Sequence, residues 1–177
     1  FGVNNRYGYY PAASAGWVIT EEKFLRNVKH LSFLKLRASY GIVGNAEIGN
    51  FPQLGLLTGS ASYVGIGGQA PNQIGNPDLK WETNKQVDIG LDFGFVNNRL
   101  SGEIDYYYRK SQDLLLNVNI DPTYGFTTQL QNIGKTSNKG VELQLGALIA
   151  KKRDFTWNAN FNISTNKNKV TSLGTVS

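Results

Sequence analysis

Residues 86–110 read QVDIGLDFGFVNNRLSGEIDYYYRK and alternate apolar with polar or small side chains on both sides of one tight turn. The apolar residues recur at every second position, as from Val87 to Phe95 and again from Leu100 to Tyr108. A period of two is the period of a β-strand. Asn97 and Asn98 between the halves suit a primed turn, whose central residues have positive φ. The stretch therefore predicts a β-hairpin.

The register of this hairpin follows from placing Phe95 opposite Leu100. Each apolar residue of the first strand then meets its equivalent in the second, and on the other face Asp92 lies beside Glu103. The apolar-face pairs are Phe93 with Gly102, Leu91 with Ile104, Ile89 with Tyr106, and Val87 with Tyr108. A dry core does not tolerate so many charged groups without partners. We therefore expect one wet face and one apolar face, with Lys35 or Arg37 from a neighbouring strand within salt-bridging distance of the acidic group.

Composition limits the possible functions. The 177 residues suffice for one domain, and 12% aromatic residues with 20 glycines suit an all-β chain. The net charge of +5 is mild and its basic residues are scattered, which disfavours nucleic-acid binding. The absence of cysteine excludes disulfides, thiolate metal sites and cysteine nucleophiles. We predict no cofactor and no metal site.

The same period of two predicts four more strands. They cover Tyr9 to Ile19, Phe33 to Ile42, Val141 to Ile149 and Phe155 to Ser164. Thr20 resembles a helix cap and predicts one or two helical turns after the first strand. Two long connections, Gly44 to Lys80 and Asp113 to Asn138, lack a sustained period, and the first has room for a small hairpin.

In an up-and-down meander, the short turns lie at one end of the sheet and the long connections at the other. The aromatic residues sort in the same way. Near the short end we expect Trp17, Phe95, Phe155 and Trp157, and near the long end Tyr9, Tyr10, Tyr40, Trp81, Tyr106 and Tyr108. Strands of about ten residues with two aromatic rims are typical of an outer-membrane β-barrel. A soluble β-sandwich also alternates, but it distributes loop lengths less regularly.

The predicted fold class is thus all-β, an antiparallel up-and-down transmembrane barrel to which this chain contributes about six strands. Its apolar face would contact lipid, and its polar face would line the lumen of the barrel. The lipid-facing residues would be Val87, Ile89, Leu91, Phe93, Leu143, Leu145, Phe161 and Ile163. The lumen-facing wall would comprise Lys35, Arg37, Asp88, Asp92, Glu103, Asp105, Arg109, Glu142, Asn158 and Asn160.

No catalytic motif stands out. His30 follows Lys29 in a short link, where an exposed loop residue is the simpler interpretation. The glycines of 65–68 lack the strand-turn-helix context of a phosphate-binding loop. Asp92 and Glu103 have the chemistry of a glycosidase pair, yet wall carboxylates neutralised by Lys35 and Arg37 explain them better. The chain is therefore not expected to be an enzyme.

Several motifs resemble the SusC/RagA-type TonB-dependent receptors of Gram-negative outer membranes. They are NPDLKWET at 76–83 with DYYY at 105–108, LRASYG at 36–41, VGN at 43–45, NIGK at 132–135 and NKGVE at 138–142. The resemblance implies a 22-stranded barrel with a plugged lumen in the outer membrane. It also implies import of glycans, peptides or chelates, a SusD-like surface lipoprotein that lids the barrel, and energy from TonB.

Residues 1–177 would then be part of the barrel domain, without the plug, the TonB-contacting segment and the closing strand. Substrate specificity would lie in the loops Asn45 to Lys80 and Gln112 to Asn138. The sequence does not identify the substrate. A non-transport barrel, such as an adhesin or a surface enzyme, and a soluble β-rich binding module remain as alternatives. A plug domain upstream in the full-length sequence would distinguish the importer from both.

Overall fold

The computed structural model describes residues 1–25 and 28–174, which fold almost entirely into β-strands. The strands are β1 (Ala12–Val18), β2 (Leu31–Asn45), β3 (Leu56–Tyr63), β4 (Ile66–Gln73), β5 (Glu82–Phe95), β6 (Leu100–Asn119), β7 (Thr128–Lys152) and β8 (Phe155–Ser172). Two single 3-10 turns, η1 (Ile19–Glu21) and η2 (Pro122–Tyr124), interrupt the links. Neither described helix is long and apolar enough to cross a membrane.

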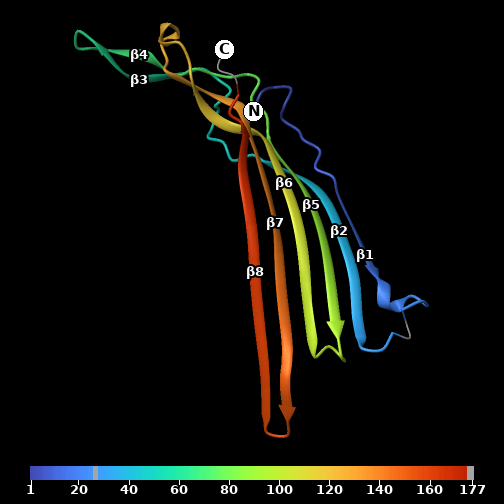
Figure 1. Cartoon of the computed structure of the whole chain (residues 1–177). Coiled ribbons are helices and arrows are strands. Elements are labelled where there is room, and N and C mark those ends of the chain that lie inside the picture. The colour runs from blue at the N-terminus through green and yellow to red at the C-terminus, as the bar shows by residue number, and fades with distance from the viewer. Residues whose placement is uncertain (26–27, 175–177) are drawn as a thin grey trace.

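Six strands form one antiparallel sheet in the order β1-β2-β5-β6-β7-β8, and β3 and β4 form a separate hairpin. Figure 1 shows the sheet as a single curved layer. The turns after β5 and β7 and the described residues between β1 and β2 lie at the end drawn at the bottom, which we call the lower end. The β3–β4 hairpin and the β6–β7 connection lie at the opposite, upper end (Figure 1). This is the predicted meander, with its short and long connections on the predicted ends.

The register of the central hairpin agrees with the prediction at every pair, including Phe95 with Leu100 and Asp92 with Glu103. Neighbouring strands continue each row, as in Arg37–Gly90–Asp105–Glu142. Because alternate residues point to opposite sides, the rows define two surfaces. The apolar face carries Leu36, Leu91, Ile104, Leu143 and Ile163, and the polar face carries the charged residues of the same strands.

A single sheet has no interior, and the exposures reflect this. Among the described residues only Leu79 and Val118 are buried apolar side chains; Leu79 precedes β5, and Val118 lies near the end of β6. On the apolar face Ile89, Ile104 and Ile163 remain 47%, 41% and 54% exposed. Monomeric soluble proteins rarely expose a contiguous apolar patch of this extent. The apolar face therefore requires a nonaqueous neighbour.

Strand β1 is shorter than predicted, but β6 and β7 are longer, and their length corrects one expected loop. Gln112 to Asn138 was expected to be a long connection, but β6 runs to Asn119 and β7 begins at Thr128, which leaves only 120–127 as the link. The register shifts between Ser111 and Leu115, where Asp113 has a φ of 57°. At this irregularity apolar and polar side chains no longer alternate, although backbone pairing continues. The period of two therefore did not reveal that β6 and β7 extend beyond it.

Other boundaries also differ. Asn45 belongs to β2, and the first long connection begins at residue 46 and includes the expected small hairpin, β3–β4. Val18 instead of Thr20 caps η1, which is one 3-10 turn, and Thr20 Oγ1 accepts a hydrogen bond from Leu34 N at 3.4 Å. The predicted helical segment extends over residues 26–27, which lie outside the described residues. In the 120–127 link, Thr123 N donates to the Asp121 carboxylate, which lowers the pKa of Asp121.

The turn from β5 to β6 has the predicted positive φ at Asn97 and Asn98, 56° and 59°, and also at Val96, 52°. Val96 N donates to His30 O at 2.8 Å, which holds the residue in place. A β-branched side chain in this left-handed region is strained, at a cost of order 1–3 kcal/mol.

We therefore expect Val96→Asn to raise the free energy of unfolding by about 1 kcal/mol, because asparagine tolerates the left-handed region. The reciprocal change Asn98→Val should lower it. Urea unfolding of the protein containing this chain measures both. An unchanged or lower stability of Val96→Asn would show that the turn is not strained.

Candidate functional site

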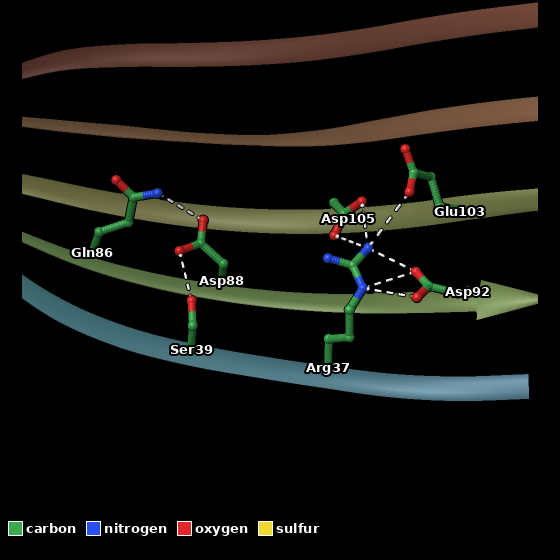
Figure 2. Close-up of polar contacts among 7 residues, drawn as sticks. All are labelled: Arg37, Ser39, Gln86, Asp88, Asp92, Glu103 and Asp105. Carbon is green, nitrogen blue, oxygen red and sulfur yellow. Dashed lines mark hydrogen bonds and ion pairs between the residues drawn. The ribbon is translucent and has the colours of Figure 1, made fainter. Parts of the chain in front are cut away.

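Arg37 is the centre of the charged group on the polar face (Figure 2). Its Nε donates to both carboxylate oxygens of Asp92 on β5, at 2.8 and 3.0 Å. Its Nη2 donates to both oxygens of Asp105 on β6, at 3.0 and 3.2 Å, and lies 3.7 Å from Glu103 Oε2. One guanidinium on β2 thus links three carboxylates on two further strands, with the directional donors that lysine lacks.

Gly90 allows the Arg37 side chain to extend across β5 to the carboxylates of β6. Arg37, Gly90 and Asp105 occupy one row of the register, so the Arg37 side chain must pass over β5 at Gly90 to contact β6. A Cβ on Gly90 would overlap the Asp105 carboxylate and lie 2.8 Å from Arg37 Nη2. A glycine inside a strand often marks such a close approach.

A second group of hydrogen-bonded polar side chains lies beside the Arg37 group on the same face (Figure 2). Ser39 Oγ and Gln86 Nε2 both donate to the Asp88 carboxylate, at 3.1 and 2.8 Å. Arg109 Nε donates to Gln86 Oε1 at 2.8 Å. Towards β8, a shallow cavity of about 230 Å³ is lined by Glu103, Asp105, Glu142, Gln144, Asn162 and Ser164 together with two apolar neighbours. Amide, hydroxyl and carboxylate groups thus extend across the whole polar face.

The predicted wall residues share this face. The register places all ten of them there: Lys35, Arg37, Asp88, Asp92, Glu103, Asp105, Arg109, Glu142, Asn158 and Asn160. The predicted bridge to Asp92 and Glu103 is confirmed for Arg37. Lys35 pairs with Asp92 in the register, but in residues 1–25 and 28–174 its ammonium has no ion pair. Asp92 is held by Arg37, as the wall interpretation of this carboxylate pair requires.

At the upper end, hydrogen bonds join the segment 74–81 to β7. Asn76 Nδ2 donates to Leu130 O at 2.8 Å, and Gln129 Nε2 donates to Gly75 O at 2.8 Å. Asn132 Oδ1 accepts from Lys80 N and Asn132 Nδ2 donates to Lys80 O, at 3.0 and 2.8 Å. Lys80 Nζ also lies 3.0 Å from Asp113 Oδ1. We call residues 76, 80, 129 and 132 the upper anchor.

The upper anchor leaves two open clefts above the sheet. One of about 550 Å³ lies between 76–80 and 129–133, and another of about 500 Å³ lies between 49–52, 72–74 and 126–130. Both are lined by asparagine and glutamine, whose amides donate and accept hydrogen bonds. The β3–β4 hairpin lies at the same upper end (Figure 1). In the described residues no group of three or more His, Asp or Glu side chains is arranged to hold a metal ion.

Comparison with known proteins decides which family this sheet represents. Residues 1–176 match the family described as "TonB dependent receptor-like, beta-barrel". The chain belongs to the TonB-dependent receptor β-barrel family. The predicted SusC/RagA-type resemblance and the predicted barrel fold class are thereby confirmed, and the open sheet is a portion of such a barrel wall.

Individual TonB-dependent receptors agree over nearly the whole chain. It is 40% identical over 173 residues to TonB-dependent receptor P39 of Formosa agariphila, and 40% identical over 182 residues to TonB-dependent receptor SusC of Bacteroides thetaiotaomicron. These alignments cover 98% of this chain but 17% and 18% of the relatives. A structure titled "RagAB peptide importer in the 'closed-closed' state" superposes with a TM-score of 0.90 at 37% identity, covering 100% of this chain and 20% of that one. The chain thus spans about a fifth of these TonB-dependent receptors.

Sequence reasoning missed the residues that assemble these groups. Gly90 is one, although a glycine between Asp88 and Asp92 on the polar face was a readable sign of close approach. Asn132 and Gln129 were placed in a loop and are strand residues of β7. The 76–83 motif was noted for its resemblance to TonB-dependent receptors, and its role in the upper anchor became visible only from the contacts.

Replacing the Arg37 guanidinium tests its part in holding the wall. Arg37→Met would leave Asp92, Glu103 and Asp105 close together without a cation, so we expect the free energy of unfolding to fall by about 1 to 2 kcal/mol. Lys35→Met, on the same strand and face, should cost less than half as much. Urea unfolding of the receptor that contains this chain measures both, and equal effects would contradict the assigned role.

Proposed function

We propose that residues 1–177 form part of the barrel wall of an outer-membrane importer of a Gram-negative bacterium, driven by TonB and specific for a nutrient such as a glycan or a peptide. The observation that carries this proposal is a family match over residues 1–176 together with a six-strand apolar face whose side chains remain exposed in the described part of the chain. Membership in a family of receptors and transporters disfavours an adhesin, a surface enzyme or a soluble binding module.

The apolar face would contact lipid and the polar face the lumen. Within a membrane, backbone polar groups must be paired internally, and the ladders of the six-strand sheet provide this pairing. The eight residues expected from the sequence to face lipid all lie on the apolar face, which supports this orientation: Val87, Ile89, Leu91, Phe93, Leu143, Leu145, Phe161 and Ile163. Arg37 and its carboxylates would then line the aqueous interior, where ionised groups remain hydrated.

Two adjacent residues of β7 test this orientation. Leu143 belongs to the apolar face and Gln144 to the polar face. In the complete receptor, Leu143→Arg should lower the free energy of unfolding by about 2 to 4 kcal/mol, the cost of arginine near the bilayer midplane. Gln144→Arg should cost under about 1 kcal/mol, because it places a cation beside Glu103 in a wet lumen. Unfolding from lipid vesicles measures both values, and the reverse ranking would show that the faces are inverted.

The upper end would face the exterior and receive the substrate. Its long connection, residues 46–81, and the 120–127 link provide adaptable surface, whereas the lower turns only close hairpins. A SusD-like lipoprotein would dock there as a lid, and TonB would act through parts of the receptor outside this chain. The similarity to a peptide importer and to SusC supports this arrangement. The amide-lined clefts suit polar ligands with many hydrogen-bonding groups.

Removing the β3–β4 hairpin tests the role of the upper end. Leu56 and Gln73 are register partners, so residues 56–73 can be excised and the ends joined by two glycines without moving the upper anchor. In the complete receptor we expect reduced substrate uptake or lipoprotein docking, with an unchanged folded fraction. Replacing Asn97-Asn98 at the lower end with Asn-Gly is the control and should leave uptake unchanged. Full uptake and docking by the excised receptor would contradict the proposal.

A further inference from the structure

Five lysines end the apolar face at its upper margin. They are Lys85 on β5, Lys110 on β6, Lys139 on β7, and Lys167 and Lys169 on β8. Their positions have the same parity as Leu91, Ile104, Leu143 and Ile163, so they lie on the apolar face. We call these five residues the outer lysine cluster.

The register brings these lysines together. Lys85 is paired with Lys110, and Lys139 is paired with Lys167. Ser137 lies between Lys110 and Lys169 in the neighbouring row. Two adjacent rows across four strands therefore hold all five ammonium groups. Like charges directly opposite each other destabilise a strand pair unless an anion lies between them.

No carboxylate on this face supplies that anion. In the described part of β5–β8, the acidic side chains Glu82, Asp88, Asp92, Glu103, Asp105 and Glu142 all lie on the polar face. Asp113, at the irregularity of β6, pairs with Lys80. Among residues 1–25 and 28–174, none of the five lysines has an ion-pair partner. The outer lysine cluster thus differs from Arg37, which has three carboxylates around it.

The distance between the outer lysine cluster and the aromatic residues of the lower end matches the thickness of a membrane's apolar band. Lys85 lies ten residues from Phe95 along β5, and Lys167 lies ten residues from Trp157 along β8. Ten residues rise about 33 Å along a strand, or about 25 Å across a membrane at a tilt of roughly 40°. This equals the usual apolar band of a barrel, about 25 Å. Tyr108 shares a row with Lys139 and Lys167, so an aromatic rim adjoins the cluster.

We infer that the outer lysine cluster binds the phosphate groups of anionic lipids in the outer leaflet. The inference rests on the proposed function, because it requires the apolar face to contact lipid and the upper end to face outward. A lipid with two phosphates on one headgroup fits best, since the paired lysines offer two neighbouring cationic sites. The acyl chains would pack on the apolar face below, which distinguishes a lipid from free phosphate.

The test compares two triple variants of the complete receptor in detergent. Lys85→Gln, Lys139→Gln and Lys167→Gln together remove three charges from the cluster. Lys151→Gln, Lys152→Gln and Arg153→Gln remove three exposed charges at the lower end as the control. The probes are fluorescent lipid A with two phosphates, the same lipid without phosphates, and inorganic phosphate as competitor.

The cluster variant should bind the bisphosphorylated lipid roughly a hundredfold more weakly, since each basic residue near a lipid surface contributes about fivefold. The control variant should stay within about twofold of the parent. The lipid without phosphates should bind all three proteins weakly and alike. Replacing the same three lysines with arginine should preserve binding, which separates loss of charge from a folding defect.

Equal affinity of the cluster variant and the control variant would overturn the inference, as would equal binding of the two lipids. Displacement of the lipid by an equimolar concentration of inorganic phosphate would show a free-phosphate site instead. Substrate uptake separates this outcome from the proposed function. If lipid selectivity is absent while the parent receptor imports its substrate, the lipid site is wrong and the importer stands.

Discussion

The backbone ladder between adjacent antiparallel strands is the interaction on which the whole structure depends. A single-layer sheet has no interior, so packing of a core cannot hold it, and Leu79 and Val118 are the only buried apolar side chains in the described residues. The ladder fixes the register, and the register fixes which side chains share a face. A one-residue slip would exchange the apolar face for the charged one.

Because the register fixes which charged side chains share a face, the two faces balance their charges in different ways. On the polar face, Arg37 crosses β5 over Gly90 and pairs with carboxylates from two strands, so a cation within the chain offsets part of their negative charge. On the apolar face, the outer lysine cluster has lysines paired with lysines and no internal anion. The first arrangement strengthens the wall by itself, whereas the second is complete only with anions from outside the protein.

Much of this arrangement could be predicted, because the period of two is a local signal. The register of 86–110 followed from one assumption at the turn, and it placed Asp92 beside Glu103 with Arg37 close by. The ends of strands were less predictable. Beyond Ser111 the strands pair through backbone groups while Leu114, Leu115 and Leu116 follow one another without alternation. The upper anchor depends on contacts between residues about fifty positions apart, such as Asn76 with Leu130, which no local pattern contains.

The central claim is that the two faces meet different solvents, and a spin-label scan tests it most directly. Single cysteines at 87 to 93 on β5 of the complete receptor, labelled with a nitroxide in lipid vesicles, report access to oxygen and to a water-soluble nickel chelate. Oxygen should reach the labels at Val87, Ile89, Leu91 and Phe93, and the chelate should reach those at Asp88 and Asp92. Loss of this alternation, or alternation in the opposite phase, would contradict the account.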